Sequence, residues 1–230
     1  MSAVMALSRA ELVQLLRNKT TASMALVLPI VLGVLFLFSP DGEPDWWKFA
    51  LSMQLISAQG LTVYVCTTTV FAARRQDLSL KRLRSGELSD LAIISGVLAP
   101  FLVLGVAQCL LLTGVAFAFG APAPANPAGL VLAIVGGVAV NAAVGLLTAA
   151  FSASAEAAQI TTAPFFFLAL GGAIWALSTD SRWAVALPGG AVATLVGGGG
   201  DVLLPLLSMA AWTAVGWALG LRYARWDRRD

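Results

Sequence analysis

The sequence contains little charge and no histidine. Only 11% of its 230 residues are charged, whereas about a quarter of the residues in a soluble domain are charged. The lack of histidine removes the commonest metal ligand and general base. The 14 basic and 12 acidic residues nearly cancel, so the placement of the charges is more informative than their sum.

Several functional classes are excluded by what is missing. The cysteines, Cys66 and Cys109, both fall in apolar runs and are expected to be buried hydrophobes rather than a disulfide. No G-x-x-x-x-G-K-[ST] phosphate loop is present, and the glycine run at 197–201 has no lysine. An intramembrane enzyme would need histidine, paired acids or a metal site within a membrane span. We therefore expect no catalytic residue, metal or cofactor in this chain, and no nucleic-acid partner.

Long uncharged windows dominate the rest of the sequence, which is 59% hydrophobic. A membrane-spanning helix needs about 20 apolar residues. The longest window is divided by the proline-rich stretch 120–129, which cannot continue a helix. The sequence predicts an all-α integral membrane protein of one domain with six transmembrane helices, near 21–38, 50–72, 91–118, 129–151, 160–178 and 202–221.

The segment 183–200 is long enough to be a seventh span, but "LPGG" interrupts it and "GGGG" ends it. We expect a broken, re-entrant or surface-lying segment that faces outward. With six spans, twelve of the 14 basic residues share one side with both termini, which indicates the cytoplasm of a multi-pass bacterial plasma-membrane protein. Those residues are Arg9, Arg17, Lys19, Arg74, Arg75, Lys81, Arg82, Arg84, Arg222, Arg225, Arg228 and Arg229. Lys48 and Arg182 lie opposite.

The segment 7–20 precedes the first span and has an amphipathic pattern. Ser8 and Glu11 have the spacing of a capping box, which predicts that a helix begins at Ser8. Leu12, Val13, Leu15 and Leu16 fall within one arc of about 160°. We expect an amphipathic helix on the inner membrane surface, while the simpler interpretation is that these are the first turns of a long span one.

The stretch 74–90, "RRQDLSLKRLRSGELSD", concentrates basic residues between two uncharged windows. A short helix over 75–85 is predicted, with an Asp77–Lys81 pair and Gly86 at its end. Three interpretations remain open: a topology determinant, a polybasic patch on anionic lipid, or a helix that docks a cytoplasmic partner.

The order of these features resembles the permease subunits of type-2 ABC exporters. A short amphipathic helix leads into a span with an early proline, "LLRNKTTASMALVLPIVLG". The loop 74–90 is similar to the family's E-R-E-x-G-T-L-x-x-L-x-x-x-P-L-S pattern, and "SASAEAAQITTAPFFFLALGG" to its "Q…P" helix after span four. The chain departs from the pattern where the family has two acids, a glycine and a proline, at Arg74, Gln76, Leu78 and Glu87.

The resemblance implies that 74–90 is a cytoplasmic coupling loop that docks on a separate ATP-binding-cassette ATPase subunit, which would hold ATP and magnesium. It implies docking residues in that loop, namely Arg75, Leu80, Lys81, Leu83, Arg84 and Leu88. It also implies that a second permease copy, identical or a close paralogue, completes the pathway in the lipid bilayer.

Polar side chains in the predicted spans could line such a pathway or hydrogen-bond between helices. The candidates for lining it are Gln54, Gln59, Tyr64 and Asn141. Because no charge lies mid-span, we expect a hydrophobic or amphipathic small molecule, similar to a drug or antibiotic, to be exported by ATP hydrolysis on the partner rather than by ion coupling. The alternatives are export of a lipid-linked, polysaccharide or haem-related molecule, or a non-transport membrane scaffold.

Overall fold

The computed structural model describes residues 3–38, 44–86, 88–179, 181–198 and 201–224, and within them every regular element is helical. Five helices or helix runs are long and apolar enough to cross a membrane. They are the run α4–η2–α5 at Asp45–Gln76, α7 at Asp90–Ala118, α8 at Pro127–Phe151, the run α9–α10 at Ala155–Ser178, and α12 at Leu203–Tyr223. The prediction of an all-α chain with several membrane helices is confirmed at this level.

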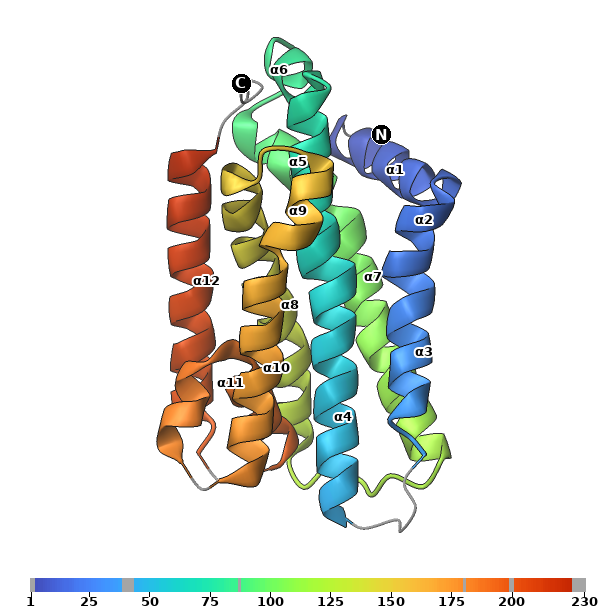
Figure 1. Ribbon diagram of the computed structural model, residues 1–230, viewed down its shortest axis with the longest axis vertical. Helices are drawn as coiled ribbons and strands as arrows, with labels where there is room; N and C mark the ends of the chain where they lie inside the picture. The colour runs from blue at the N-terminus through green and yellow to red at the C-terminus, as the bar shows by residue number, and fades with distance from the viewer. Residues whose placement is uncertain (1–2, 39–43, 87, 180, 199–200, 225–230) are drawn as a thin grey trace.

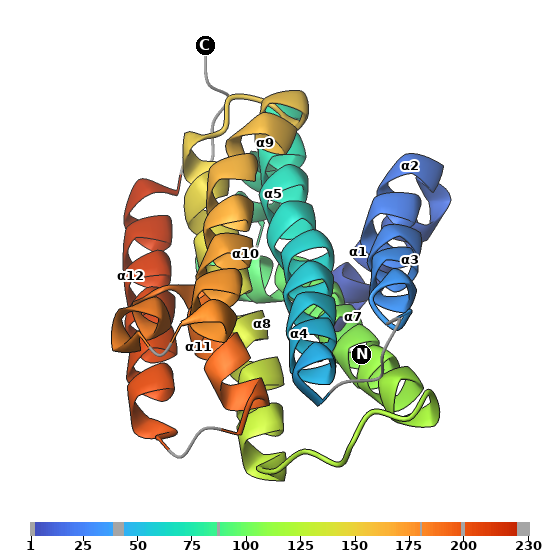
Figure 2. The same ribbon diagram turned by 60° about the horizontal axis from the view of Figure 1, so that its bottom comes forward.

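The long helices form a bundle with two different ends (Figure 1). The helices α1 (Ala3–Arg17), α6 (Ser79–Arg84) and α9 (Ala155–Thr161) lie at one end with both termini, and we call it the α6 end. Helix α11 (Pro188–Val196) and the start of α4 lie at the opposite end, the α11 end. The run α4 (Pro44–Ala58), η2 (Gln59–Val65) and α5 (Cys66–Gln76) is largely buried among the other long helices (Figure 2).

The first long segment turns sharply between α1 and the helices that follow it. The residues Val4–Arg17 and Lys19–Leu35 meet at an angle of 95°, so the second part counts as a sixth candidate span only together with its bent partner. The side chain of Asn18 accepts a hydrogen bond from the Thr21 amide at 3.2 Å, which caps the helix that begins at Lys19. The chain can therefore end one helix at Arg17 and start another in a new direction.

The predicted capping box at Ser8 and Glu11 is wrong. Helix α1 begins at Ala3, so Ser8 lies inside it, and its hydroxyl is within hydrogen-bond distance of Gly96 O in α7 at 2.9 Å. Glu11 is buried rather than on the solvent face. Tertiary contacts at the α6 end engage the two polar side chains that the local pattern assigned to a helix start.

Pro29 explains how the first span is fastened to its neighbours. Because proline has no N–H, it cannot donate to the carbonyl of Ala25, one turn earlier in the π-helix η1 (Ser23–Val27). Ala25 O instead accepts hydrogen bonds from Thr62 Oγ1 in η2 at 2.7 Å and from Gln108 Nε2 in α7 at 2.9 Å. A carbonyl that cannot accept the usual hydrogen bond from residue 29 thus joins three helices inside the bundle.

This junction leads to a testable rescue. The single changes Thr62→Val and Gln108→Leu should each lower the free energy of unfolding by about 0.6 kcal/mol, the average for such bonds between membrane helices. The double variant should lose more than the sum, because Ala25 O then has neither donor. Adding Pro29→Ala should recover part of the loss, since an alanine at this position supplies an N–H. Unfolding by denaturing detergent measures all four variants; strict additivity without rescue would contradict the explanation.

The α11 end contains two short helices between α10 (Ala163–Ser178) and α12. They are the 3-10 helix η3 (Arg182–Ala186) and α11, and they stand where a seventh long helix was considered. Gly189 and Gly190 let α11 approach its neighbours closely, because a Cβ at either position would overlap a backbone carbonyl, of Ala169 or of Ala184. The prediction that 183–200 is a broken segment agrees with these two short helices. Residues 199–200 lie outside the described residues.

We expect Gly189→Ala to destabilise the protein by about 1–3 kcal/mol, because backbone rather than a flexible side chain must give way. Gly171→Ala, in α10, is the matched control, since an added Cβ there meets nothing within 4 Å. Thermal unfolding of both variants in detergent tests this close packing. Equal melting temperatures for the two variants would show that α11 does not pack as described.

Candidate functional site

The coupling-loop candidate lies at the α6 end, directly after the longest helix run. A short helix lies within the predicted range 75–85, but its predicted start is wrong: α5 continues to Gln76, and a separate helix of six residues, α6, begins at Ser79. The break falls at Leu78, which has a positive φ of 57°, a left-handed conformation that is costly for a branched side chain. Leu78 stands where the pattern of the type-2 exporter permeases has glycine. The residue differs from that pattern, but its backbone has the conformation that glycine favours.

Three leucines of this loop pack against the protein, whereas Leu78 is 42% exposed. Leu80 is only 4% exposed and packs in a cluster with Phe71 of α5, Ile94 of α7 and Leu146 of α8. Leu83 and Leu88 pack against the same cluster. The prediction that Leu80 contacts a partner is therefore corrected, because its buried side chain fixes α6 to the ends of three helices. Leu83 and Leu88 are partly buried, and their contact with a partner stays a prediction.

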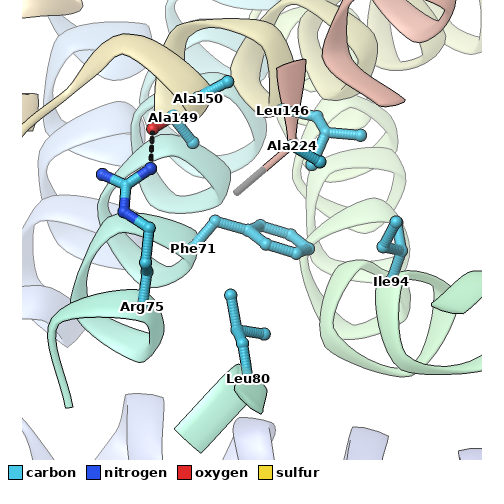
Figure 3. Close-up of a pocket in the computed structure, with 8 residues that line it drawn as sticks. All are labelled: Phe71, Arg75, Leu80, Ile94, Leu146, Ala149, Ala150 and Ala224. Atoms are coloured by element: carbon cyan, nitrogen blue, oxygen red, sulfur yellow. Dashed lines mark hydrogen bonds between the residues drawn. The ribbon is translucent and has the colours of Figure 1, made fainter. Parts of the chain in front are cut away.

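Arg75 was also predicted to contact a partner, and the structure places it inside the chain. Its side chain is 3% exposed, and Nη1 donates to Ala149 O at 2.9 Å (Figure 3). Nη2 donates to Ser152 O. Both carbonyls belong to the end of α8, where helical carbonyls have no partner within the helix. A cation at a helix C-terminus also complements the helix dipole, so Arg75 closes α8.

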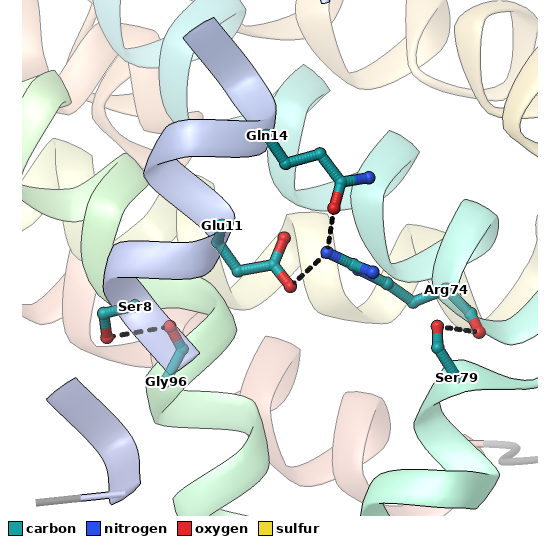
Figure 4. A network of polar contacts seen from close by, with 6 residues as sticks. All are labelled: Ser8, Glu11, Gln14, Arg74, Ser79 and Gly96. Atoms are coloured by element: carbon teal, nitrogen blue, oxygen red, sulfur yellow. Dashed lines mark hydrogen bonds and ion pairs between the residues drawn. The ribbon is translucent and has the colours of Figure 1, made fainter. Parts of the chain in front are cut away.

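The neighbouring Arg74 connects the same loop to α1. Its Nη2 lies 2.6 Å from Glu11 Oε1 and also donates to Gln14 Oε1 (Figure 4). The Glu11 carboxylate is 3% exposed, whereas the Arg74 side chain is 20% exposed, so the acidic partner is the buried one. The Arg74 carbonyl accepts from Ser79 Oγ at 2.9 Å, which fixes the turn into α6. One residue therefore links α1, α5 and α6.

A second bond of α1 could have been inferred from proline, although the sequence analysis missed it. Pro100 lies inside α7 and cannot donate to Gly96 O, one turn earlier. Ser8 of α1 lies within hydrogen-bond distance of this carbonyl, and a Cβ on Gly96 would come within 2.7 Å of Leu7. The proline and the glycine together create the place where α1 rests on α7. The sequence signal that could have revealed this contact is Pro100 with Gly96 four residues before it, in a segment too apolar to be a loop.

The exposed part of α6 is basic. Lys81, Arg82 and Arg84 are exposed, and we call these three side chains the basic face of α6. Arg82 Nη2 donates to Asp77 O at 2.7 Å, and Arg84 Nε lies 3.1 Å from Asp90 Oδ1. The Asp77–Lys81 pair expected from the sequence stays a prediction. The exposed side of α6 itself is thus charged, although Leu78, directly before it, is also exposed.

The four candidate pathway residues are buried between helices. Gln54 Nε2 donates to Gly33 O at 2.7 Å and Gln59 Nε2 to Ala133 O at 3.1 Å. Tyr64 and Thr148 share a hydrogen bond of 3.2 Å, and Asn141 donates to Gly137 O in its own helix. Within the single chain, Gln54, Gln59 and Tyr64 hydrogen-bond to other helices. Their expected place along a pathway stays a prediction.

The structure does not bring the two sets of predicted site residues together. The loop residues gather at the α6 end, whereas the polar span residues lie within the bundle. Comparison of the chain with protein families and with curated proteins finds no match. The functional conclusion therefore depends on the geometry of the α6 end and on the resemblance in sequence.

Proposed function

We propose that the chain is the membrane-spanning permease subunit of an ATP-driven exporter, with a separate ATPase docked on α6. The observation that carries this proposal is the construction of α6. Its outer side presents Lys81, Arg82 and Arg84, and its inner side is packed into the ends of α5, α7 and α8. A force applied to the basic face would be transmitted directly to three long helices.

The buried bonds of Arg75 and Arg74 support the same role. They make the turn between α5 and α6 continuous with α8 and α1. A loop needed only to keep positive charge in the cytoplasm would not require two guanidinium groups directed into the chain. The partner surface should be acidic, because the accessible side of α6 is basic rather than apolar.

The membrane helices support a hydrophobic or amphipathic substrate. Gln54 Nε2, Gln59 Nε2 and the Tyr64 hydroxyl each have a hydrogen-bond partner within the chain. In this proposal the chain is multi-pass in the bacterial plasma membrane with six spans, both termini are cytoplasmic, and two copies form the pathway. Arg225, Arg228 and Arg229, which contribute to this orientation, lie outside the described residues.

Co-purification with ATP-binding-cassette ATPases from the same organism tests the proposal. Lys81→Glu with Arg82→Glu should abolish association, because both charges on the accessible face of α6 are reversed. Arg9→Glu with Arg17→Glu is the matched control, since it makes the same charge change on exposed positions of α1. Failure of the unaltered chain to bind any of these ATPases, or equal binding by both double variants, would overturn the docking model.

A further inference from the structure

A groove at the α11 end has the shape and charge of a lipid site. It lies between η3 and α12 and has a volume of about 550 Å³. That volume is within the range of about 300–1,000 Å³ typical of small-molecule sites. Its walls are mainly apolar, and Arg182 is the charged residue among those that line it. The apolar lining includes Trp183, Val185, Leu204, Ala211 and Trp212.

The groove runs along the first turns of α12. Leu204 and Ala211 both line it, and a rise of about 1.5 Å per residue separates them by about 10 Å along the helix. The hydrocarbon layer of one leaflet is about 15 Å deep. A groove of this length at the end of a membrane helix therefore matches the depth of the upper part of one acyl chain.

The aromatic walls fit the membrane interface. Trp183 is 77% exposed, and tryptophan gathers where hydrocarbon meets headgroups. Trp212 Nε1 donates to Ala186 O at 2.8 Å, which fixes this ring between α12 and η3. The wall of the groove is thus a positioned side chain rather than a freely rotating one.

Arg182 stands between this groove and a more polar cavity of about 810 Å³, which it also lines. Two acidic side chains of that cavity already have partners. Asp45 pairs with Lys48 at 2.8 Å, and Asp201 Oδ1 accepts from the Leu203 amide at 3.0 Å. Arg182 is exposed and lines both hollows, so its guanidinium lies at the boundary between the polar cavity and the apolar groove.

We propose that this groove binds an anionic phospholipid of the outer leaflet. One acyl chain lies against Trp183 and Trp212, and the lipid phosphate pairs with the Arg182 guanidinium, whose planar fork suits phosphate oxygens. A phospholipid with no cationic headgroup is preferred because no positive charge then opposes Arg182. The inference needs membrane helices in the proposed orientation but no ATPase, so its failure and that of the docking model are distinguishable.

Fluorescence quenching tests the site directly. The full chain is reconstituted in vesicles that contain phosphatidylglycerol or phosphatidylcholine with brominated acyl chains, and tryptophan quenching is compared. The groove signal is the difference between the unaltered chain and Trp183→Phe. We expect this signal to need about fivefold less brominated phosphatidylglycerol than phosphatidylcholine, the factor for one basic residue near an anionic surface.

Arg182→Gln should remove the preference, and Lys48→Gln should keep it, since Lys48 is the other basic residue assigned to this side and is paired with Asp45. Ala211→Phe, which fills the groove, should weaken quenching by both lipids. Circular dichroism shows whether each variant retains its helices. A preference that survives Arg182→Gln, or quenching that is equal for the two lipids in the unaltered chain, would overturn the proposal.

Discussion

Replacing Arg75 with methionine should destabilise the protein by about 3 kcal/mol, although the new side chain has a similar reach and is apolar. The guanidinium satisfies Ala149 O and Ser152 O at the end of α8, and both carbonyls would lose a charged donor in a buried place. Hydrogen bonds to charged groups contribute about 1.5–3 kcal/mol each. Detergent-titrated unfolding, followed by tryptophan fluorescence, measures the loss.

Two variants separate this effect from a simple loss of charge. Arg75→Lys keeps the charge but not the planar fork, so it should retain only part of the stability. Arg82→Met removes an exposed guanidinium from the same loop and should change the unfolding midpoint little. If Arg75→Met and Arg82→Met behaved alike, Arg75 would not close α8.

The ion pair between Glu11 and Arg74 should show an unequal response to loss of either partner. Arg74→Gln leaves the Glu11 carboxylate buried without its cation, which should cost about 3–5 kcal/mol. Glu11→Gln should cost less, because the Arg74 side chain is 20% exposed and its guanidinium can turn toward solvent. The measurement is the free energy of unfolding in detergent.

The double variant Glu11→Gln with Arg74→Gln should recover most of what Arg74→Gln loses, because no charge is then left buried. Proteolysis near Asn18, at the bend between α1 and the following helix, provides an independent readout: cleavage should be fastest for Arg74→Gln. Equal losses for the two single variants, with no recovery in the double one, would contradict a buried pair as the attachment of α1.

The helices themselves were predictable because membrane helices are selected by length and hydropathy, which are local properties. Expected spans such as 91–118 and 129–151 differ from α7 and α8 by no more than two residues at either end. The break within 183–200 could also be predicted, because a proline followed by two glycines, and then a run of four glycines, occur within residues 188–200. A single proline or glycine pair is not sufficient, since Pro100 lies inside α7 and Gly136 and Gly137 lie inside α8. The sequence therefore determined which segments are long apolar helices.

The roles of the polar side chains depend on the tertiary structure. The pattern of Ser8 and Glu11 is that of a helix start, yet both face other helices. Leu80 and Arg75 have the types expected at a docking surface, but packing against α5, α7 and α8 buries them. Composition cannot show which side of a six-residue helix meets the bundle.

Backbone carbonyls explain much of the difference between the roles that the sequence predicts for polar side chains and the roles that the structure shows. Pro29 and Pro100 are visible in the sequence, and each leaves the carbonyl one turn earlier without its usual donor. The sequence alone does not show that Thr62 and Gln108 supply one donor set and Ser8 the other, because these partners come from distant segments. The sequence determined where bonds had to be replaced, and only the packing of the helices decided which side chains replace them.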